Sequence, residues 1–590
     1  MSCRKTIFSK SKVCSAVALV LTSAFSNVWA DNQANILQEG ERNYIDGEQF
    51  GDNLVIEAAF VGDDNDFASN QEGLNSTVRV NLFGQANQLN LEQNNAIGNI
   101  IDYEVDGVDN NVSIFQNDNN TVFASLLGSN NTFVLEQYDF SNTINLVGFV
   151  GDNNVISIQQ DGFLQGLNFS ASTTNSSSIF TFQIGDLNDI NASIGSDQNT
   201  LLLEQDGNFN TIDISAASDF QDIISYQQGE LNQLELTLNS GESSTIETSQ
   251  VGDFNSISNT VNGDSFLNAI NIQQTGEFND VTSDFFSASQ NTLAVQQTGN
   301  VNAISLFTQN ASNNDLDLTQ NGDSNFYQLD NLEGINNNIF VDQFGVSNTT
   351  TNIVSGDANL LDIVQSGEES SVGSQIAGVG NTQVVDQLGN LNLALSEIIG
   401  DDNTLVTLQD GVSNTVNTVI NGNANNLGIS QIGSENTVFA SVFGLSENIE
   451  MTVEQDGLSN NVSSEVFAGN GHQVQVEQLG DLNEFIVQVN QTGFGDFNDI
   501  SASQVGLSNI ADIILDGAEN IIDIEQIGND NIISGLNNLP FMTIDGSQNS
   551  ISISQSGNLN QVQGFVTGSN QTLNVTQLGG QNTVLISQTR

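Results

Sequence analysis

The sequence predicts an all-β protein, a flattened β-solenoid with two strands per rung of about 22 residues, cross-β stacking and roughly two dozen rungs. Three observations support this fold class. A Gln-x-Gly-x-x-Asn phrase recurs along the chain, mostly at intervals of 22 or 23 residues. Apolar and polar residues alternate on either side of each phrase, as in strands that bury one face. The chain has one proline, a residue excluded from central strands because it lacks a backbone donor.

Each repeat divides into two strands and two turns. Residues 403–409 form a seven-residue segment, and the four residues 410–413 follow it. A second segment of seven, residues 414–420, is followed by a second group of four, residues 421–424. The groups of four carry Gly with Asn or Asp, which tolerate the positive φ angles of tight turns. Every 22 residues therefore give one rung with a strand on each side.

The alternation also assigns side chains to an inner and an outer face. Leu203 and Leu201 lie two and four residues before Gln205, whereas Glu204 takes the opposite parity. Successive strand residues point to opposite faces, so apolar residues are expected inside and carboxylates outside. The same inward pairs are Ile270 with Ile272, Val474 with Val476 and Ile551 with Ile553, and the outward acids include Glu92, Glu136, Asp317, Glu454, Glu477 and Glu525.

The amides of each phrase are expected to stack from rung to rung as ladders. Buried amides are costly unless they are paired, and stacked Asn and Gln side chains pair along the axis of a cross-β structure. We interpret these residues as scaffold rather than as a binding site. The expected structural ladder comprises Gln183, Asn188, Gln205, Asn210, Gln250, Asn255, Gln274, Asn279, Gln297, Asn302, Gln409, Asn414, Gln431, Asn436, Gln478, Asn483, Gln555, Asn560, Gln577 and Asn582.

Residues 1–30 have the pattern of a secretory signal peptide, and residues 31–590 carry the repeats. Four basic residues precede an apolar run at 16–24, which is too short to span a bilayer, and the small residues Val28 and Ala30 on either side of Trp29 suit cleavage. Cys3 and Cys14 both fall in this segment. The exported chain is therefore expected to have no disulfide, no thiol chemistry and no transmembrane segment.

The charge of the mature chain restricts its partners. After removal of residues 1–30, only Arg42, Arg79 and Arg590 remain against 71 acidic residues, a net charge of about −68. A chain this anionic does not bind nucleic acid or an anionic membrane surface by electrostatics. Its natural counter-ligands are cations. No cofactor is expected, and weak Ca²⁺ binding by surface carboxylates stays open.

The sequence contains no arrangement typical of an enzyme. His472 is the only histidine, so a histidine triad or a histidine metal cluster is excluded by count. Because it follows Gly469-Asn470-Gly471, we interpret it as a surface residue of a turn. Paired acids such as Asp401 and Asp402 also fall in turns, where carboxylates are usually solvated. A carboxylate-only glycosidase needs a cleft that narrow rungs with four-residue turns do not provide.

Two irregular steps in the repeat predict loops that bulge from a rung. The step from Gln478 to Gln504 is four residues too long, around residues 493–495. The step from Gln526 to Gln555 is seven residues too long and contains Pro540. The strand expected at residues 582–588 has no following strand to pair with, so it would present an open edge. Such an edge can template pairing with another chain.

The repeats resemble those of the curlin family. QSGNLN at Gln555, followed by NQTLNVTQ up to Gln577, is a close instance, and the resemblance covers nearly all of residues 31–590. It implies a secreted subunit that polymerises with itself into curli, the functional amyloid fibres of the biofilm matrix, and supports cell adhesion and aggregation. It further implies a nucleator subunit and an outer-membrane export pore as partners, and an extracellular fibre at the cell surface as the location. The chain departs from the family in having several times the usual number of repeats.

Two other functions are compatible with a solenoid. A monomeric, acidic, calcium-binding β-solenoid adhesin is the main alternative, although the Gly-Gly-x-Gly-x-Asp nonapeptide is absent. An ice-binding solenoid would need a flat Thr-x-Thr array, and the outward threonines of this chain are scattered. We therefore expect a fibre-forming matrix protein.

Overall fold

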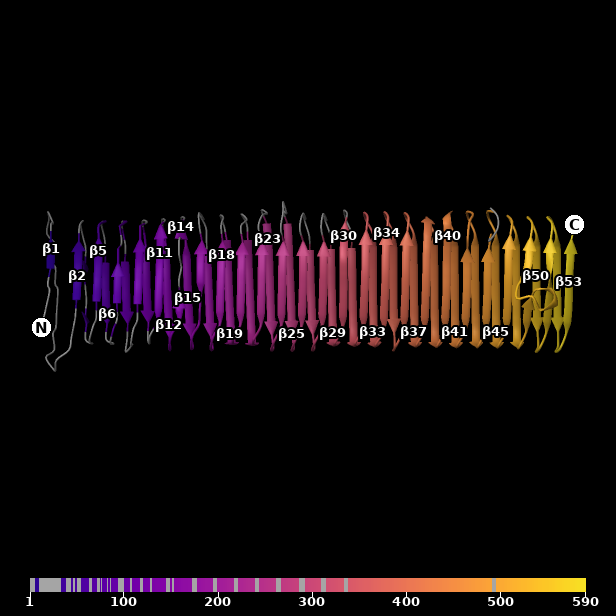
Figure 1. Ribbon diagram of the computed structural model, residues 1–590, viewed down its shortest axis with the longest axis horizontal. Coiled ribbons are helices and arrows are strands. Elements are labelled where there is room, and N and C mark those ends of the chain that lie inside the picture. The colour runs from indigo at the N-terminus through magenta and orange to yellow at the C-terminus, as the bar shows by residue number, and fades with distance from the viewer. Residues whose placement is uncertain are drawn as a thin grey trace. The chain divides into compact units, whose positions relative to one another are not determined.

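The computed structural model describes residues 153–171, 178–194, 199–216, 221–238, 243–261, 267–285, 292–308, 315–333, 338–490 and 495–589 (Figure 1). Before residue 151 it describes shorter stretches, mostly strands. The chain forms two compact units, residues 1–300 and 301–590. Of the predicted signal peptide, only β1 (Thr6–Ser9) falls within the described residues. The rest of that segment, and the predicted loop at residues 493 and 494, lie outside them.

In both units the described residues form a parallel β-solenoid without an α-helix, with about 18 turns in all. The predicted all-β solenoid is thus confirmed, but the number of turns is smaller than the predicted two dozen. The predicted regular pair of strands per rung is also interrupted in the N-terminal unit. There β3 (Tyr44–Ile45) and β4 (Glu48–Gln49) both pair with β6, and β13 (Thr143–Ile144) and β14 (Phe149–Val150) both pair with β11. These breaks coincide with the repeats in which the Gln-x-Gly-x-x-Asn phrase is degraded.

In each unit the strands form two walls, and we call the wall that carries the phrase glutamines the glutamine wall. In the N-terminal unit this wall contains β3, β4, β6 (Asp66–Gln71), β8 (Gln88–Gln93), β10 (Asn111–Gln116), β12 (Thr132–Tyr138), β15 (Val155–Asp161), β17 (Ser178–Ile184), β19 (Asn199–Asn208), β21 (Gln221–Glu230), β23 (Ser243–Val251), β25 (Leu267–Thr275) and β27 (Thr292–Thr298). The opposite wall contains β1, β2 (Gln33–Gln38), β5 (Val55–Phe60), β7 (Thr77–Val80), β9 (Ile100–Val105), β11 (Thr121–Leu127), β13, β14, β16 (Asn168–Ala171), β18 (Asp189–Ile194), β20 (Thr211–Ala216), β22 (Gln233–Leu238), β24 (Ser256–Val261) and β26 (Asp280–Phe285).

The C-terminal unit has the same two walls. Its glutamine wall contains β29 (Asp315–Asp323), β31 (Asn338–Val346), β33 (Leu360–Glu368), β35 (Thr382–Leu388), β37 (Thr404–Val412), β39 (Asn426–Ser434), β41 (Glu450–Leu458), β43 (Gln473–Asp481), β45 (Asp499–Leu507), β47 (Ile521–Asn529), β50 (Ser550–Ser556) and β52 (Thr572–Leu578). Its opposite wall contains β28 (Ala303–Thr308), β30 (Phe326–Glu333), β32 (Thr349–Ser355), β34 (Ser371–Ala377), β36 (Leu393–Ile399), β38 (Thr415–Asn423), β40 (Thr437–Glu447), β42 (Asn461–Val466), β44 (Glu484–Val489), β46 (Ile510–Asp516), β48 (Ile532–Ser534), β49 (Met542–Asp545), β51 (Gln561–Thr567) and β53 (Thr583–Thr589).

Strands pair in parallel with the strand one repeat further along the chain. Gln409 on β37 lies opposite Gln431 on β39, and Thr415 on β38 lies opposite Thr437 on β40. Paired strands lie about 4.8 Å apart. Each position of the repeat therefore stacks on the same position of its neighbours, which is why a periodic sequence produces continuous rows of identical side chains.

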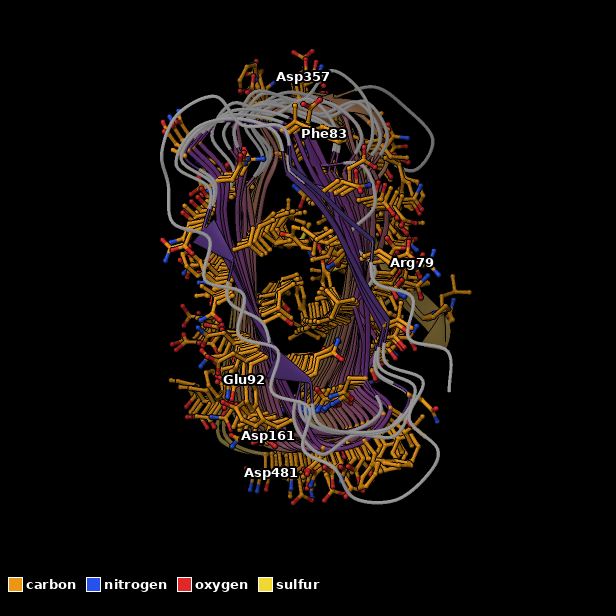
Figure 2. The ribbon with its side chains drawn as sticks, turned by 90° about the vertical axis from the view of Figure 1, so that its left-hand side faces the viewer. Arg79, Phe83, Glu92, Asp161, Asp357 and Asp481 are labelled. Carbon is orange, nitrogen blue, oxygen red and sulfur yellow. The ribbon has the colours of Figure 1, made fainter. Side chains whose placement is uncertain are left out.

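The core lies between the two walls and follows the predicted parity. Leu201, Leu203 and Ile272 are buried, whereas Glu204 keeps part of its surface in solvent. Figure 2 shows Glu92 on one wall and Arg79 on the other, both pointing outward, while other side chains project into the space between the walls. The inward apolar and outward acidic faces predicted from the sequence are confirmed.

The predicted bulge at Pro540 is also confirmed. Strand β46 pairs with β48 through Ala511 and Ile533, and then with β49 through Ile513 and Met542. The intervening loop, which contains the single 3₁₀ turn η1 (Leu536–Asn538), leaves the wall and returns to the same rung. Proline is tolerated there because the loop makes no ladder hydrogen bonds.

Candidate functional site: polar ladders and stacking faces

The glutamines of the phrase form a hydrogen-bonded chain inside the solenoid. Gln387 Nε2 donates to Gln409 Oε1 at 2.8 Å, and Gln409 Nε2 donates to Gln431 Oε1 at 2.9 Å. The same Nε2 of Gln409 also donates to the backbone oxygen of Leu393 on the opposite wall, at 3.1 Å. Each amide thus uses both of its N–H groups, one along the stack and one across it. Along the stack, the donor always points toward the next repeat.

The asparagines of the phrase form a second ladder that closes the turn. Asn414 Nδ2 donates to the backbone oxygen of Gly433 at 3.0 Å, and Asn414 Oδ1 accepts from the backbone N–H of Asn436 at 3.1 Å. The glycine of the phrase is required by close packing. A Cβ added to Gly411, where φ is +131°, would lie 1.8 Å from the oxygen of Gly433. Glutamine, glycine and asparagine therefore act together in one stacked turn.

The structure places the expected ladder residues in these two rows. Nineteen of the twenty residues are 0 to 3% exposed, and the exception, Asn582, is half-buried. Asn582 is nevertheless bonded, because its Nδ2 donates to Asn560 Oδ1 at 2.9 Å. The arrangement is that of a scaffold whose polar groups are satisfied by stacking.

Sequence reasoning left out a third ladder at the other edge of the solenoid. Asn403 Nδ2 donates to Asn381 Oδ1 at 3.1 Å, and Asn425 Nδ2 donates to Asn403 Oδ1 at 3.1 Å. Asn403 also donates to the oxygen of Gly422 at 2.7 Å. The available signal was the asparagine that opens the first seven-residue segment of a repeat.

His472 occupies a position in this third ladder, which corrects its interpretation as a surface residue. It is 0% exposed. Its Nδ1 accepts a hydrogen bond from the backbone N–H of Asn498 at 3.1 Å, and its Nε2 lies 3.2 Å from the oxygen of Ala468. The tetrad before it is a turn, but the residue that ends such a turn points inward. Burial lowers the pKa of the His472 imidazole.

The outward carboxylates form rows of like charge. Glu454 on β41 lies directly opposite Glu477 on β43. Where such groups are partly covered, their pKa values rise: burial raises the pKa of Asp317, and the neighbouring Asp342 and Asp315 raise it further. Burial, with a smaller effect of Glu484, raises the pKa of Asp512 to about 7.

The last described strands present a stacking face. Gln577 accepts at Oε1 from Gln555 at 2.8 Å, and its Nε2 donates to the oxygen of Gln561 at 3.0 Å. No later amide among the described residues accepts its second N–H. The core residues Leu573 and Val584 are only half-buried on this face, while Val562, one rung earlier, is fully buried.

Two features are missing from the part of the chain that the structure describes. There, no three acidic, histidine or cysteine side chains gather closely enough to hold a metal ion. No helix within the same residues is long and apolar enough to cross a membrane. Comparison with known proteins gives no relative: no protein-family model matches the chain, and no curated protein is significantly similar to it.

Proposed function

We propose that the chain is a secreted structural subunit that polymerises by stacking into curli-like amyloid fibres of an extracellular biofilm matrix. The observation that carries the proposal is the equivalence of the turns. Gln387, Gln409 and Gln431 make the same contacts in successive turns. Each turn presents an amide donor on one face and an amide oxygen on the other. A turn of a second copy has the same groups in the same places.

Stacking between copies would reproduce the contacts made within one chain. The second N–H of Gln577 points from the stacking face toward the position of a following amide oxygen, and Leu573 and Val584 would lose their remaining exposure. Burial of apolar surface contributes about 25 cal/mol per Å², and the strand edge would gain ladder hydrogen bonds. Because every donor along the glutamine ladder points toward the next repeat, the copies would join head to tail.

The finer architecture and the partners belong to the same proposal. The repeats would form rungs with two strands each, stacked at about 4.8 Å in a cross-β fibre. Residues 1–30 would direct export and be removed. The resemblance to curlin repeats supports a nucleator subunit and an outer-membrane pore as partners, a cell-surface location, and a role in adhesion and aggregation rather than catalysis.

A calcium-binding adhesin is the second candidate, and one observation favours it. Asp315, Asp317 and Asp342 lie close enough on the outer face of the C-terminal unit to raise the pKa of Asp317. Carboxylate oxygens are the ligands that Ca²⁺ prefers, although no three acidic side chains among the described residues lie close enough together to hold the ion by themselves. A monomeric adhesin would bind calcium without polymerising. Whether the chain polymerises therefore distinguishes the two functions.

A seeded elongation assay with two variants of one strand tests the proposal. Ile586 is a buried core residue of the rung at the stacking face, whereas Leu585, its neighbour on β53, points outward. Ile586→Lys should abolish or strongly slow elongation from wild-type seeds, because it places a charge between copies. Leu585→Lys adds the same charge outside the stack and should elongate at close to the wild-type rate.

Three outcomes are informative. Slow elongation of the Ile586→Lys variant alone supports stacking at this face. Equal elongation of both variants would show that copies do not join there. A wild-type chain that stays monomeric with preformed seeds, with and without millimolar calcium, would contradict fibre formation and favour the adhesin.

A further inference from the structure

One inner row of the C-terminal unit is polar where the neighbouring rows are apolar. Its residues lie on the opposite wall. Each comes four positions after the residue that closes the Gln-x-Gly-x-x-Asn phrase. Successive strands place these residues in register, in the order Asn352, Ser374, Ser396, Thr418, Ala440 and Ser464. Elsewhere in this unit the same row holds Leu306, Leu329, Val487 and Ile513.

Several polar groups in this row have no partner in the protein. The hydroxyls of Ser396, Thr418 and Ser464 are buried and accept or donate no hydrogen bond, and neither does the hydroxyl of Thr407 from the glutamine wall. A buried hydroxyl without a partner costs about 1–3 kcal/mol, so a run of them is not expected in a dry core.

Gln383 adds an amide to the same interior. It takes the inward position that Leu361 and Leu405 hold on the neighbouring strands. The hydroxyl of Ser374 donates to Gln383 Oε1, which anchors the amide against the opposite wall. The Nε2 of Gln383 has no partner. Two further N–H donors therefore point into the polar row.

Space for a ligand is present beside these groups. Ser374 and Ser396 are 7% and 8% exposed, although Val372 and Ala394, two residues earlier on the same strands, are 0% exposed. Ser, Thr and Ala replace the larger Leu, Val and Ile of other turns, which leaves room between the walls. A polar cavity with several hydrogen-bonding groups and room for a water-sized sphere is normally hydrated.

The row is closed at both ends by apolar side chains. Leu329 lies in register with Asn352 and is 1% exposed, and Val487 lies in register with Ser464 and is fully buried. The ligand must therefore be small, neutral and able to both donate and accept hydrogen bonds.

We propose that residues 352–464 enclose an internal file of ordered water molecules, bound by Gln383, Ser396, Thr407, Thr418 and Ser464. Stacked strands lie about 4.8 Å apart, which is too far for a direct hydrogen bond between the hydroxyl or amide groups of neighbouring rungs. Each water supplies the hydrogen bonds that these groups lack. Exchange with bulk solvent requires local opening of the solenoid, because no open end leads into the row. The inference is independent of fibre formation.

The N-terminal unit contains a shorter version of the same feature. Asn259 and Ser283 occupy this row on neighbouring strands, both are buried, and neither side chain has a partner. Leu236 precedes them in register and closes the row on that side. Unpartnered polar groups thus occur at this position of the repeat in two separate places.

Water-edited solid-state NMR of the full-length chain, labelled with ¹³C in threonine and valine, tests the file directly. The Thr407→Val and Thr418→Val variants identify the two threonine signals by their loss. Polarisation from water should reach Thr418 as quickly as it reaches Thr415, a partly exposed residue of the same strand, and severalfold faster than it reaches the buried Val416. Transfer to Thr418 as slow as that to Val416 would show a dry core and overturn the proposal.

A stability comparison provides a second, independent readout. Thr418→Val keeps the side-chain shape and removes the hydroxyl. If water satisfies that hydroxyl, its loss should lower the denaturation midpoint, whereas removal of an unsatisfied hydroxyl from a dry core should raise it. Thr415→Val, on the outer face of the same strand, serves as the control for strand propensity. A raised midpoint for Thr418→Val relative to this control would contradict the water file.

Discussion

The imidazole Nδ1 of His472 accepts a hydrogen bond from the backbone N–H of Asn498, which lies one turn further along the stack, at 3.1 Å. An accepting Nδ1 requires a neutral ring with its proton on Nε2, and the Nε2 atom faces the oxygen of Ala468. Protonation would place two donors against each other in a buried site. His472 therefore makes a structural ladder sensitive to acid.

Replacing this histidine should remove the sensitivity. The lowered pKa of folded His472 means that, below the ordinary value of about 6.5, the unfolded chain takes up a proton that the folded chain does not. The free energy of unfolding should therefore fall as the pH decreases below about 6.5. His472→Asn introduces the residue found at most other positions of this ladder, such as Asn498, and should flatten this dependence. Chemical denaturation at pH values between 8 and 5 measures the difference, and identical profiles for both chains would refute it.

Asp512 should have the opposite effect on pH dependence. On β46, Asp512 lies between Ala511, which pairs with β48, and Ile513, which pairs with β49. It is therefore opposite the loop that contains Pro540. The pKa is raised from 3.8 to about 7. Between these values the folded chain holds more protons than the unfolded chain, so stability should fall as the pH rises from about 4 to about 7.

The variant Asp512→Asn should lose that decline and be more stable than the wild type at pH 8. Asp523→Asn, an outward change on β47 of the glutamine wall, is the matched control. A wild-type decline that persists in Asp512→Asn would mean that another group causes it.

Breaking one rung of the glutamine ladder should be costly. Gln409→Leu leaves Gln387 without an acceptor and Gln431 without a donor inside the core. Leaving buried polar groups unsatisfied should lower the free energy of unfolding by about 1–3 kcal/mol for each group. The exposed Gln375 on β34 provides the control, because Gln375→Leu breaks no ladder bond. Equal midpoints for the two variants would show that the ladder contributes nothing to stability.

The two faces of a strand should differ sharply in their tolerance of substitution. Ile272→Asp places an unpaired carboxylate in a thin core and should cost several kcal/mol, on the order of the penalty for burying an unpaired charge. Glu204→Gln removes one charge from an outward acidic row and should change stability by less than about 0.5 kcal/mol. Hydrogen exchange of the surrounding strands would resolve the local effect. Similar exchange in the two variants would contradict the assigned parity.

Much of this architecture follows from the sequence because the repeat is short and regular. Leu201 and Leu203 are predictable inside and Glu204 outside, since their distances from Gln205 fix the strand parity. Pro540 is predictable in a loop because the repeat there is seven residues too long. In each case one local rule determines the outcome, and stacking repeats it.

Other features depend on register between turns, which the sequence does not display. His472 was interpreted as exposed because its tetrad reads as a turn, but the end of that turn points into the third ladder. Ser396 and Thr418 have the parity of core residues and lie one repeat apart, but only the structure shows that their hydroxyls have no partner in the protein. The predicted number of rungs exceeds the number of turns that the structure describes. The N-terminal repeats account for this difference, because their weak phrases give short or split strands.

Fibre diffraction from the purified chain, residues 31–590, tests the central claim most directly. Chains that stack as their own turns do should give aligned, unbranched fibres with a meridional reflection at about 4.8 Å and an equatorial reflection near 10 Å. The same preparation should bind thioflavin and seed fresh monomer. A chain that stays monomeric for days at high concentration, or fibres without the meridional reflection, would contradict stacking as the function of this solenoid.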